Sequence, residues 1–463
     1  MSSRHAQKTG TVTPFLTAPV GRLFVANALP LVLVLSTAGV LNVVDGVIVG
    51  RYLGSPALAA VSATFPVVML VTALAVMVGG GMSSRMARYL GAGQRTAAAR
   101  ELSAAQALAL MIALVLGPVL LLSGRSLAAL LTGDAPQVAA MSHDYLRVIA
   151  LALPLQLLLS LHADALRNGG RAGQVALLSV VVNVVNIVAN VILIAGCGLG
   201  VAGSALGMAL AQAVGLVWVI GLRKRDTALL PLTALGGKHD VRPWASILLL
   251  GLPVSLSLLG TAVVSTTVIL ALRAAADREV MLSAYGIVTR VLGLSYLVQM
   301  AIALALQTIV GHNMGAGLHR RAAVALRIGV VSAGVGCLLV VIVLLAMRTR
   351  LGLMFTASPD VAKDVGTVLR AMLLFYVFSG PLLTLAMFFQ AVGRPREAAL
   401  LTLVKPWLLT PVLVFSCVAI GGTRALWYAF PVADAVLVGA VIVAWQRRRS
   451  RRPAARRPTG DGA

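Results

Sequence analysis

Residues 23–50 read LFVANALPLVLVLSTAGVLNVVDGVIVG, an apolar run in which Asp45 is the single charged side chain. An α-helix rises about 1.5 Å per residue and the hydrocarbon core of a bilayer is roughly 30 Å thick, so about 20 apolar residues span it. The run therefore predicts a transmembrane helix. Asp45, close to one end of that helix, is the residue that needs a chemical explanation.

The composition of the whole chain agrees with this first helix. Of its 463 residues, 59% are hydrophobic and only 11% are charged, a balance that soluble globular domains rarely show. The same length criterion predicts an all-α membrane protein with twelve transmembrane helices. The predicted spans are residues 23–50, 56–82, 101–123, 145–166, 174–195, 204–222, 244–272, 281–309, 323–347, 365–391, 398–420 and 426–445.

The net charge of +24 reports topology rather than a nucleic-acid partner, because the cations lie in short loops and form no basic face with stacking aromatics. With twelve spans, the two termini and the even-numbered loops share one side, which holds 26 Lys and Arg against 10 on the other. This excess predicts a multi-pass protein of the inner (cytoplasmic) membrane with both termini cytoplasmic. Residues 1–22 lack a signal-peptide pattern and form a cytoplasmic segment, and residues 446–463 form a disordered basic tail.

The sequence contains an internal repeat. Four landmarks recur at one nearly constant spacing, close to half the length of the chain, which predicts two copies of a six-helix unit that enter the membrane in the same orientation. The predicted N-lobe covers 23–222, the cytoplasmic linker 223–243 and the C-lobe 244–445. The paired landmarks are Gly91-Ala-Gly93 with Gly315-Ala-Gly317, Leu29-Pro30 with Leu252-Pro253, Gly170-Arg171 with Gly393-Arg394, and Ala176-Leu-Leu178 with Ala399-Leu-Leu401.

Motifs in the loops carry a resemblance to a known family. In order and spacing, they resemble the multidrug and toxic compound extrusion (MATE) family over residues 20–446. The resemblance implies two pseudo-symmetric six-helix bundles around a V-shaped cleft, and export of organic, often cationic, compounds against an inward flow of H⁺ or Na⁺. The motifs are Gly50-Arg-Tyr-Leu-Gly54, Ala57-Leu-Ala-Ala60, Ser84-Arg-Met-Ala-Arg-Tyr-Leu-Gly-Ala-Gly93, Gly198-Leu-Gly-Val-Ala-Gly203 and Val310-Gly-His-Asn-Met-Gly-Ala-Gly317.

Asp45 is the first candidate for the coupling site. A carboxylate inside a span costs roughly 2.5–3.5 kcal/mol on insertion scales, so it is usually functional or paired, and no cation lies within residues 23–50. Loss of water favours its neutral form, so it can take up and release a proton. The resemblance implies that Asp45 is the helix-1 acid of the N-lobe ion site. The alternative is a solvated carboxylate near the outer surface.

The fifth predicted helix supplies candidate neighbours, because Asn183, Asn186 and Asn190 recur at helical spacing on one face. In the family an Asn is followed four residues later by an Asp, which maps onto Asn186 and Asn190, so the second acid is missing. A family Thr that binds sodium falls on Met208, whose thioether is a poor ligand for a hard cation. The coupling ion is therefore expected to be H⁺ rather than Na⁺. The alternative is that the three amides only join helices.

Further polar residues within the spans are secondary candidates. Asp164 lies beside Arg167, which predicts an ion pair near the end of its helix. Asp434 and Lys405 are natural partners across helices, and Arg290 could also pair with an acid. We expect no metal or cofactor and no enzymatic activity, because the spans contain no catalytic cluster. The three cysteines, at 197, 337 and 417, also lack metal-ligand spacing.

The function expected from these features is that of a secondary active multidrug exporter of the cell membrane. It would act as a monomer and move amphipathic organic, mainly cationic, compounds out of the cytoplasm in exchange for H⁺ or Na⁺, which would confer drug or antibiotic resistance. The alternative is a flippase for lipid-linked oligosaccharide or lipid of the same wider superfamily. Such a flippase would bring about two more helices and several Arg residues in its cleft, whereas only Arg290 and Lys405 lie within the predicted spans.

Overall fold

The computed structural model describes residues 14–132, 135–225, 241–273, 275–355 and 358–450. Within these ranges the chain is helical and contains no strand. The helices are α1 Pro14–Thr17, α2 Val20–Leu53, α3 Ser55–Ala63, α4 Phe65–Gly91, α5 Arg95–Thr132, α6 Pro136–Asn168, α7 Ala172–Val191, α8 Gly200–Arg225, α9 Arg242–Ala271, α10 Arg278–Gly315, α11 His319–Phe355, α12 Pro359–Met372, α13 Ser379–Val392, α14 Pro395–Val404, α15 Thr410–Gly421 and α16 Ala429–Ser450. Shorter turns are η1 Ile192–Gly196, η2 Tyr376–Phe378, η3 Lys405–Leu409 and η4 Thr423–Tyr428.

The predicted number of spans agrees with the described helices. Eleven of them are long and apolar enough to cross a membrane, and α12 together with η2 and α13 makes a twelfth that is bent by 59°. The span predicted over 365–391 is therefore present as a bent pair of helices. Pro381 lies in the first turn of α13 and has no N–H to bond the carbonyl of Val377, so a continuous helix would be interrupted there.

Several helices extend beyond the apolar runs that predicted them. α5 begins six residues before the predicted span 101–123 and ends nine residues after it. α16 reaches Ser450, so the first five residues of the predicted tail are helical, and α1 and the start of α2 lie in the predicted N-terminal segment. Hydropathy marks the part of a helix that lies in hydrocarbon, whereas the backbone hydrogen bonds continue into the polar region. The rest of the tail, residues 1–13 and most of the linker lie outside the described residues.

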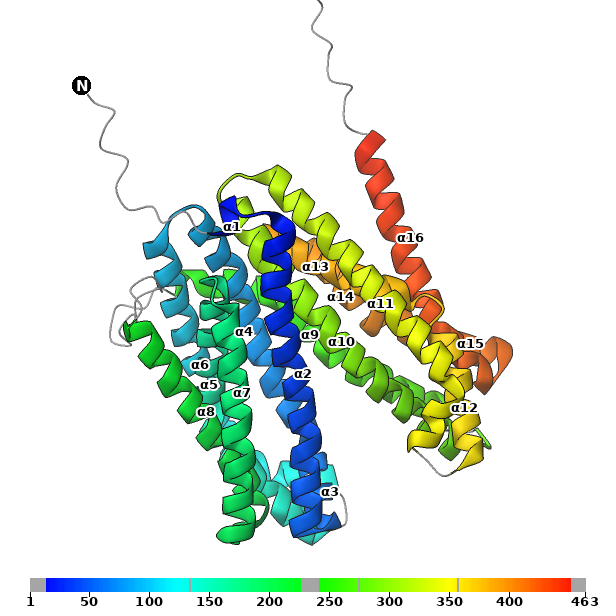
Figure 1. Ribbon diagram of the computed structural model, residues 1–463. Coiled ribbons are helices and arrows are strands. Elements are labelled where there is room, and N and C mark those ends of the chain that lie inside the picture. The colour runs from blue at the N-terminus through cyan, green and yellow to red at the C-terminus, as the bar shows by residue number, and fades with distance from the viewer. Residues whose placement is uncertain (1–13, 133–134, 226–240, 274, 356–357, 451–463) are drawn as a thin grey trace, which may run out of the picture.

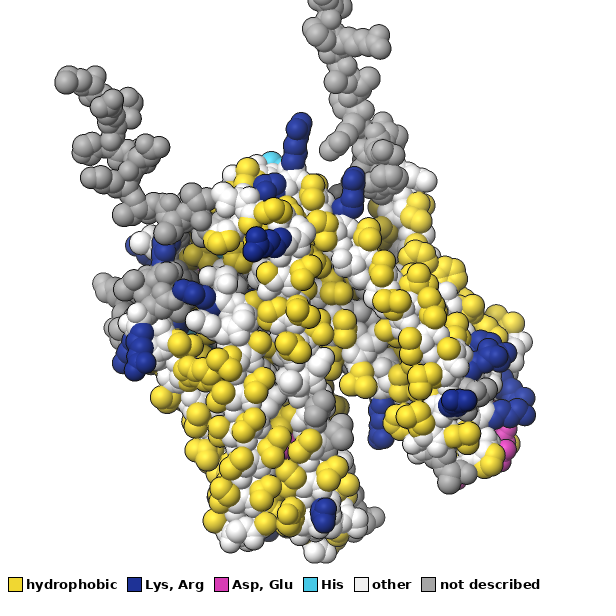
Figure 2. Space-filling view, viewed as in Figure 1, with side chains coloured by type: hydrophobic (Ala, Val, Ile, Leu, Met, Phe, Trp, Pro, Cys, Tyr) yellow, Lys and Arg dark blue, Asp and Glu magenta, His cyan; other side chains and the backbone are white. Residues whose placement is uncertain are grey.

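The helices form two lobes that are packed together at one end and splayed at the other (Figure 1). The N-lobe contains α2 to α8, and the C-lobe contains α9 to α16. We call the end near the last turns of α4 and α10 the closed end, and the opposite end, where α2 and α15 finish, the open end. Figure 2 shows the gap between the lobes widening toward the open end, which is the predicted V-shaped cleft.

The repeated Gly-Ala-Gly motifs lie where the lobes touch. A Cβ on Gly91 at the end of α4 would overlap the backbone of His312 in α10, and a Cβ on Gly315 in α10 would overlap the backbone of Arg88 in α4. The internal repeat pairs Gly91 with Gly315 and, at the same spacing, Arg88 with His312, so the two contacts are equivalent. α4 and α10 therefore cross on the pseudo-twofold axis. Only glycine allows two helix backbones to approach this closely.

Polar contacts also join the lobes at the closed end. Arg88 Nη1 donates to the carbonyl of Ala391 in α13 at 2.8 Å, and the Ser84 hydroxyl donates to the carbonyl of Gln390. From α6, buried Arg167 donates to Thr308 Oγ1 of α10 at 3.0 Å. Because each bond links α4 or α6 of the N-lobe to the C-lobe, opening this end requires them to break together.

The glycine crossing predicts a strong effect of a single methyl group. Gly315→Ala should lower the free energy of unfolding by about 1–3 kcal/mol, the usual cost of overpacking, because the new Cβ meets the Arg88 backbone rather than a flexible side chain. Thermal or denaturant unfolding of the purified protein in detergent measures this. Gly336→Ala in α11 is the matched control, since its Cβ would meet nothing within 4 Å. Equal unfolding of both variants would contradict the role of the crossing.

Candidate functional site

Asp45 lies in the open-end half of α2 and forms a hydrogen-bonded cluster with α7. Asn190 Nδ2 donates to Asp45 Oδ1 at 2.8 Å. The Asn186 amide is oriented so that both its nitrogen and its oxygen have hydrogen-bond partners. In this orientation Asn186 Nδ2 also donates to Asp45 Oδ1 at 3.1 Å, and Asn186 Oδ1 accepts from the backbone N–H of Met208 in α8 at 3.0 Å. Both asparagines are buried. The spacing of four residues puts them one turn apart on the face that α7 presents to α2.

The third asparagine of the predicted set is not part of this cluster. Asn183 Nδ2 is buried and has no hydrogen-bond partner among the described residues. Asn190 Oδ1 is likewise unpartnered and lies against α8, where a Cβ on Gly207 would overlap it. The glycine thus makes room for the Asn190 side chain between α7 and α8.

Tyr145 of α6 is a further member of the site that the sequence did not reveal. Its side chain is almost fully buried, at 4% exposure, and lies close enough to Asp45 to experience the charge of the carboxylate. A tyrosine at the beginning of a predicted span suggests an interfacial anchor. No local pattern could show that Tyr145 lies near enough to Asp45 to experience its charge.

The charge of Asp45 has no cationic partner. Among the described residues no ion pair joins it to Lys, Arg or His, and the groups that bond it are neutral amides. Protonation of Asp45 therefore changes the net charge of this part of the N-lobe by one unit, with no nearby cation to offset it. The half-buried side chain remains open to exchange with water.

Asp164 occupies a different place from Asp45. Arg167 Nη2 donates to Asp164 Oδ1 at 2.8 Å, which confirms the predicted pair. The same guanidinium reaches Ser83 Oγ of α4 and Thr308 of α10, so the pair belongs to the contact between the lobes at the closed end. Asp164 therefore stabilises the closed end and is separated from the Asp45 cluster.

The predicted pair of Lys405 and Asp434 is also formed. Lys405 Nζ lies 2.5 Å from Asp434 Oδ1, and this contact joins η3 to α16 inside the C-lobe. The Asp434 carboxylate is 5% exposed and the lysine side chain 29%, so the acid is the buried partner. Arg290, by contrast, is exposed and makes no hydrogen bond or ion pair with the rest of the described chain. The four secondary candidates therefore lie in three separate places.

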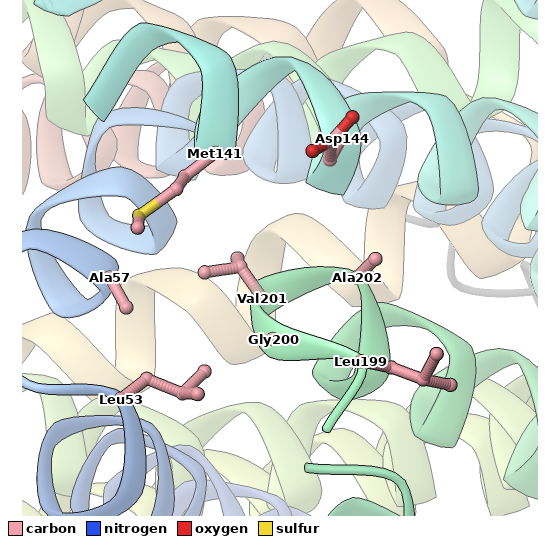
Figure 3. A pocket seen from close by; sticks show the side chains of 8 residues that line it. All are labelled: Leu53, Ala57, Met141, Asp144, Leu199, Gly200, Val201 and Ala202. Carbon is pink, nitrogen blue, oxygen red and sulfur yellow. The ribbon is translucent and has the colours of Figure 1, made fainter. Parts of the chain in front are cut away.

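A small cavity opens at the open end of the N-lobe (Figure 3). Its volume is about 200 Å³, below the roughly 300–1,000 Å³ of sites for drug-sized ligands. Asp144 is its one charged lining residue, and Asp45 is not part of its wall. This cavity is therefore too small to enclose a drug-sized ligand. The cavity is lined by Leu53, Ala57, Met141, Asp144, Leu199, Gly200, Val201 and Ala202.

Comparison with known proteins identifies the family. The MatE family model matches residues 30–192 and, a second time, 253–415. The chain belongs to the MatE family. The two matched segments begin at Pro30 and Pro253, which are themselves one of the paired landmarks of the internal repeat. MatE proteins are transporters, so this chain is a membrane transporter and not an enzyme, as the sequence predicted.

Solved structures and curated relatives support the MatE fold over nearly the full length. The outward-facing conformation of a multidrug resistance MATE family transporter of the MOP superfamily has a TM-score of 0.87 and 23% identity, covering 97% of this chain and 100% of that one. A MOP superfamily transporter from Pyrococcus furiosus has a TM-score of 0.86 and 24% identity, covering 96% of this chain and 98% of that one. The FAD transporter of Shewanella oneidensis is 25% identical over 435 residues, 91% of this chain and 93% of the relative.

The geometry of the MatE site predicts different roles for two asparagines of α7. Asn190→Ala removes a donor at 2.8 Å from Asp45 and should lower transport per folded molecule about tenfold, because a bond to a charged group is lost. Asn183→Ala is the matched control, because its Nδ2 has no partner to lose. Transport by reconstituted vesicles, normalised to protein, measures both. Equal transport by the two variants would reduce Asn190 to a packing residue.

Proposed function

We propose that this MatE protein exports amphipathic organic compounds from the cytoplasm in exchange for protons, and that Asp45 carries the proton. The observation that supports this most strongly is the Asp45 cluster itself. Within a membrane span, a carboxylate is held by two neutral amides, and no cation of the described residues forms an ion pair with it. Proton uptake removes its charge and weakens both bonds to α7, which frees α2 to repack against the N-lobe.

The arrangement of donors favours H⁺ over Na⁺ as the coupling ion. A hard cation needs several oxygen ligands that converge on one point. Here both amides present N–H groups to Asp45 Oδ1, and the oxygen of Asn186 is engaged by the Met208 backbone. The oxygen of Asn190 lies against Gly207. N–H donors stabilise the carboxylate as an anion but repel a metal ion, whereas a proton needs only one free carboxylate oxygen.

The orientation follows from charge. The closed end carries basic residues that include Arg88, Arg171 and Arg394, and it lies on the same side as α1 and the end of α16. We place this end in the cytoplasm, according to the excess of Lys and Arg on that side. The cleft then opens outward, and Asp45 is in a position to receive protons from outside.

Two classes of cargo are proposed. The resemblance to multidrug transporters favours organic cations, and the near full-length similarity to an FAD transporter favours a flavin dinucleotide. The flippase alternative is disfavoured because at most twelve candidate spans occur in the described chain, without the two additional helices expected for it.

Removal of the ionisable group tests the mechanism. Asp45→Asn should abolish transport driven by an imposed pH gradient in reconstituted vesicles, measured with ethidium and with FAD, because an amide cannot carry a proton. Asp45→Glu can ionise but is longer, so it should retain part of the activity. A sodium gradient alone should drive neither cargo in the wild type.

The control for this experiment is Asp144→Asn, which removes an exposed carboxylate of the same helix bundle and should transport as the wild type does. Binding of each cargo to the Asp45→Asn protein shows that the variant is folded. Full pH-driven transport by Asp45→Asn would refute proton carriage at this position.

Labelling of single cysteines tests the orientation. In a background with Cys197, Cys337 and Cys417 replaced by Ala, a cysteine at His319 should be protected from an impermeant maleimide in intact cells. A cysteine at exposed Arg424, at the open end, should react. The reverse pattern would invert the orientation, and reaction of both would contradict the number of spans.

A further inference from the structure

We propose that Arg290 binds an anionic group, a carboxylate or a phosphate, of the transported molecule inside the cleft. This inference rests on the proposed export function, because it assigns a chemical group of the cargo to the same cleft. It is supported by the place of Arg290 on α10, by its lack of a protein partner and by the space around it.

Arg290 lies on the face of α10 that is turned toward the N-lobe. It is about five full helical turns from Thr308, so both side chains leave the helix in the same direction. Thr308 accepts a bond from Arg167 of the N-lobe. Between Arg290 and Thr308, two leucines of α10 approach Gly39 of α2. A Cβ added at Gly39 would lie 3.7 Å from a methyl carbon of Leu294 and 3.2 Å from one of Leu297. Arg290 is the next residue of this face toward the open end, beyond these two leucines.

Arg290 and Asp45 lie at a similar depth on opposite walls of the cleft. Asp45 is six residues, about 9 Å, beyond Gly39 along α2. Arg290 is four residues, about 6 Å, beyond Leu294 along α10 in the same direction. The two do not pair, because Asp45 is turned toward Asn190 of its own lobe. The positive charge of Arg290 is therefore left for a third group.

An unpaired arginine within a membrane span is costly unless it faces a water-filled cavity. Arg290 is exposed, and none of the ion pairs among the described residues includes it. In the same lobe Lys405 is paired with Asp434. Arg290 thus carries a positive charge without an ion pair among the described residues, and we place its side chain in the cleft, where water or a ligand can stabilise it.

The surroundings of Arg290 leave room for a ligand. Gly286 and Gly293 lie one turn before and after it on α10, and a Cβ on either would meet nothing within 4 Å. The same holds for Gly46 of α2, on the opposite wall at about the same depth. These three glycines therefore leave open space on both helices at the depth of Arg290, where a bulky organic anion can be accommodated.

The chemistry of the guanidinium selects the ligand group. Its N–H donors form a rigid fork that matches two oxygens of a carboxylate or phosphate, and the bond is strengthened where apolar walls exclude part of the solvent. A cationic group is repelled at this position. Of the two proposed classes of cargo, Arg290 therefore favours the one that carries a carboxylate or phosphate at one end.

Three probes with one aromatic body test this assignment: 2-naphthyl phosphate, 2-naphthol and 2-naphthylmethylammonium. Binding to the purified full-length protein in nanodiscs is measured by isothermal titration calorimetry. Wild type should prefer the phosphate. Arg290→Gln should weaken phosphate binding about ten- to hundredfold and leave 2-naphthol unchanged, because only the charge-assisted bonds are lost. Arg290→Lys should be intermediate, since it keeps the charge but not the fork.

Arg278→Gln is the matched control. It removes the same charge from α10 at the open end, outside the proposed contact, and should bind all three probes as the wild type does. Equal binding of the phosphate by wild type and Arg290→Gln would overturn the inference, as would an equal loss in Arg278→Gln. The measurement uses no ion gradient, so it stands apart from the test of Asp45. Phosphate binding through Arg290 without pH-driven transport would refute proton coupling alone.

Discussion

The close crossing of α4 and α10 at the closed end is the contact on which the shape of the molecule depends. Gly91 and Gly315 bring two helix backbones together on the pseudo-twofold axis, and each is placed against the backbone of the partner helix. The lobes are then joined at one end by packing and by the bonds of Arg88 and Arg167. With the lobes held there, they diverge at the other end, and the cleft is the result.

The low polarity of the membrane governs how charged residues are used within the lobes. Most acids within the spans are satisfied by a specific neighbour: Asp164 by Arg167 and Asp434 by Lys405. Asp45 is bonded by amides instead, so its charge is stabilised but not neutralised. The proposed role in proton coupling therefore falls to Asp45, the carboxylate that no cation neutralises among the described residues.

The two lobes share a fold but not their polar chemistry. The internal repeat, in the register that aligns Pro30 with Pro253, places Val268 at the position of Asp45, and Leu409 and Leu413 at those of Asn186 and Asn190. The same register places Val182 and Ala211 where the C-lobe has Lys405 and Asp434. Each polar cluster thus occurs once, which is consistent with proton coupling in the N-lobe and recognition of an anionic group on the C-lobe wall.

The sequence by itself determined the membrane class, the repeat, the family and the number of spans, because hydropathy and repeated motifs act along the chain. It also predicted the pairs of Asp164 with Arg167 and of Asp434 with Lys405, since few partners were available to each charge, but not the pair of Arg85 with Glu101. Only the tertiary structure decided that Asn186 and Asn190 reach Asp45 while Asn183 does not, that Tyr145 joins them, and that Arg290 stands alone. These outcomes depend on the rotation and tilt of each helix, which are set by packing against other helices and, at Gly207 and Gly315, by the absence of a single Cβ.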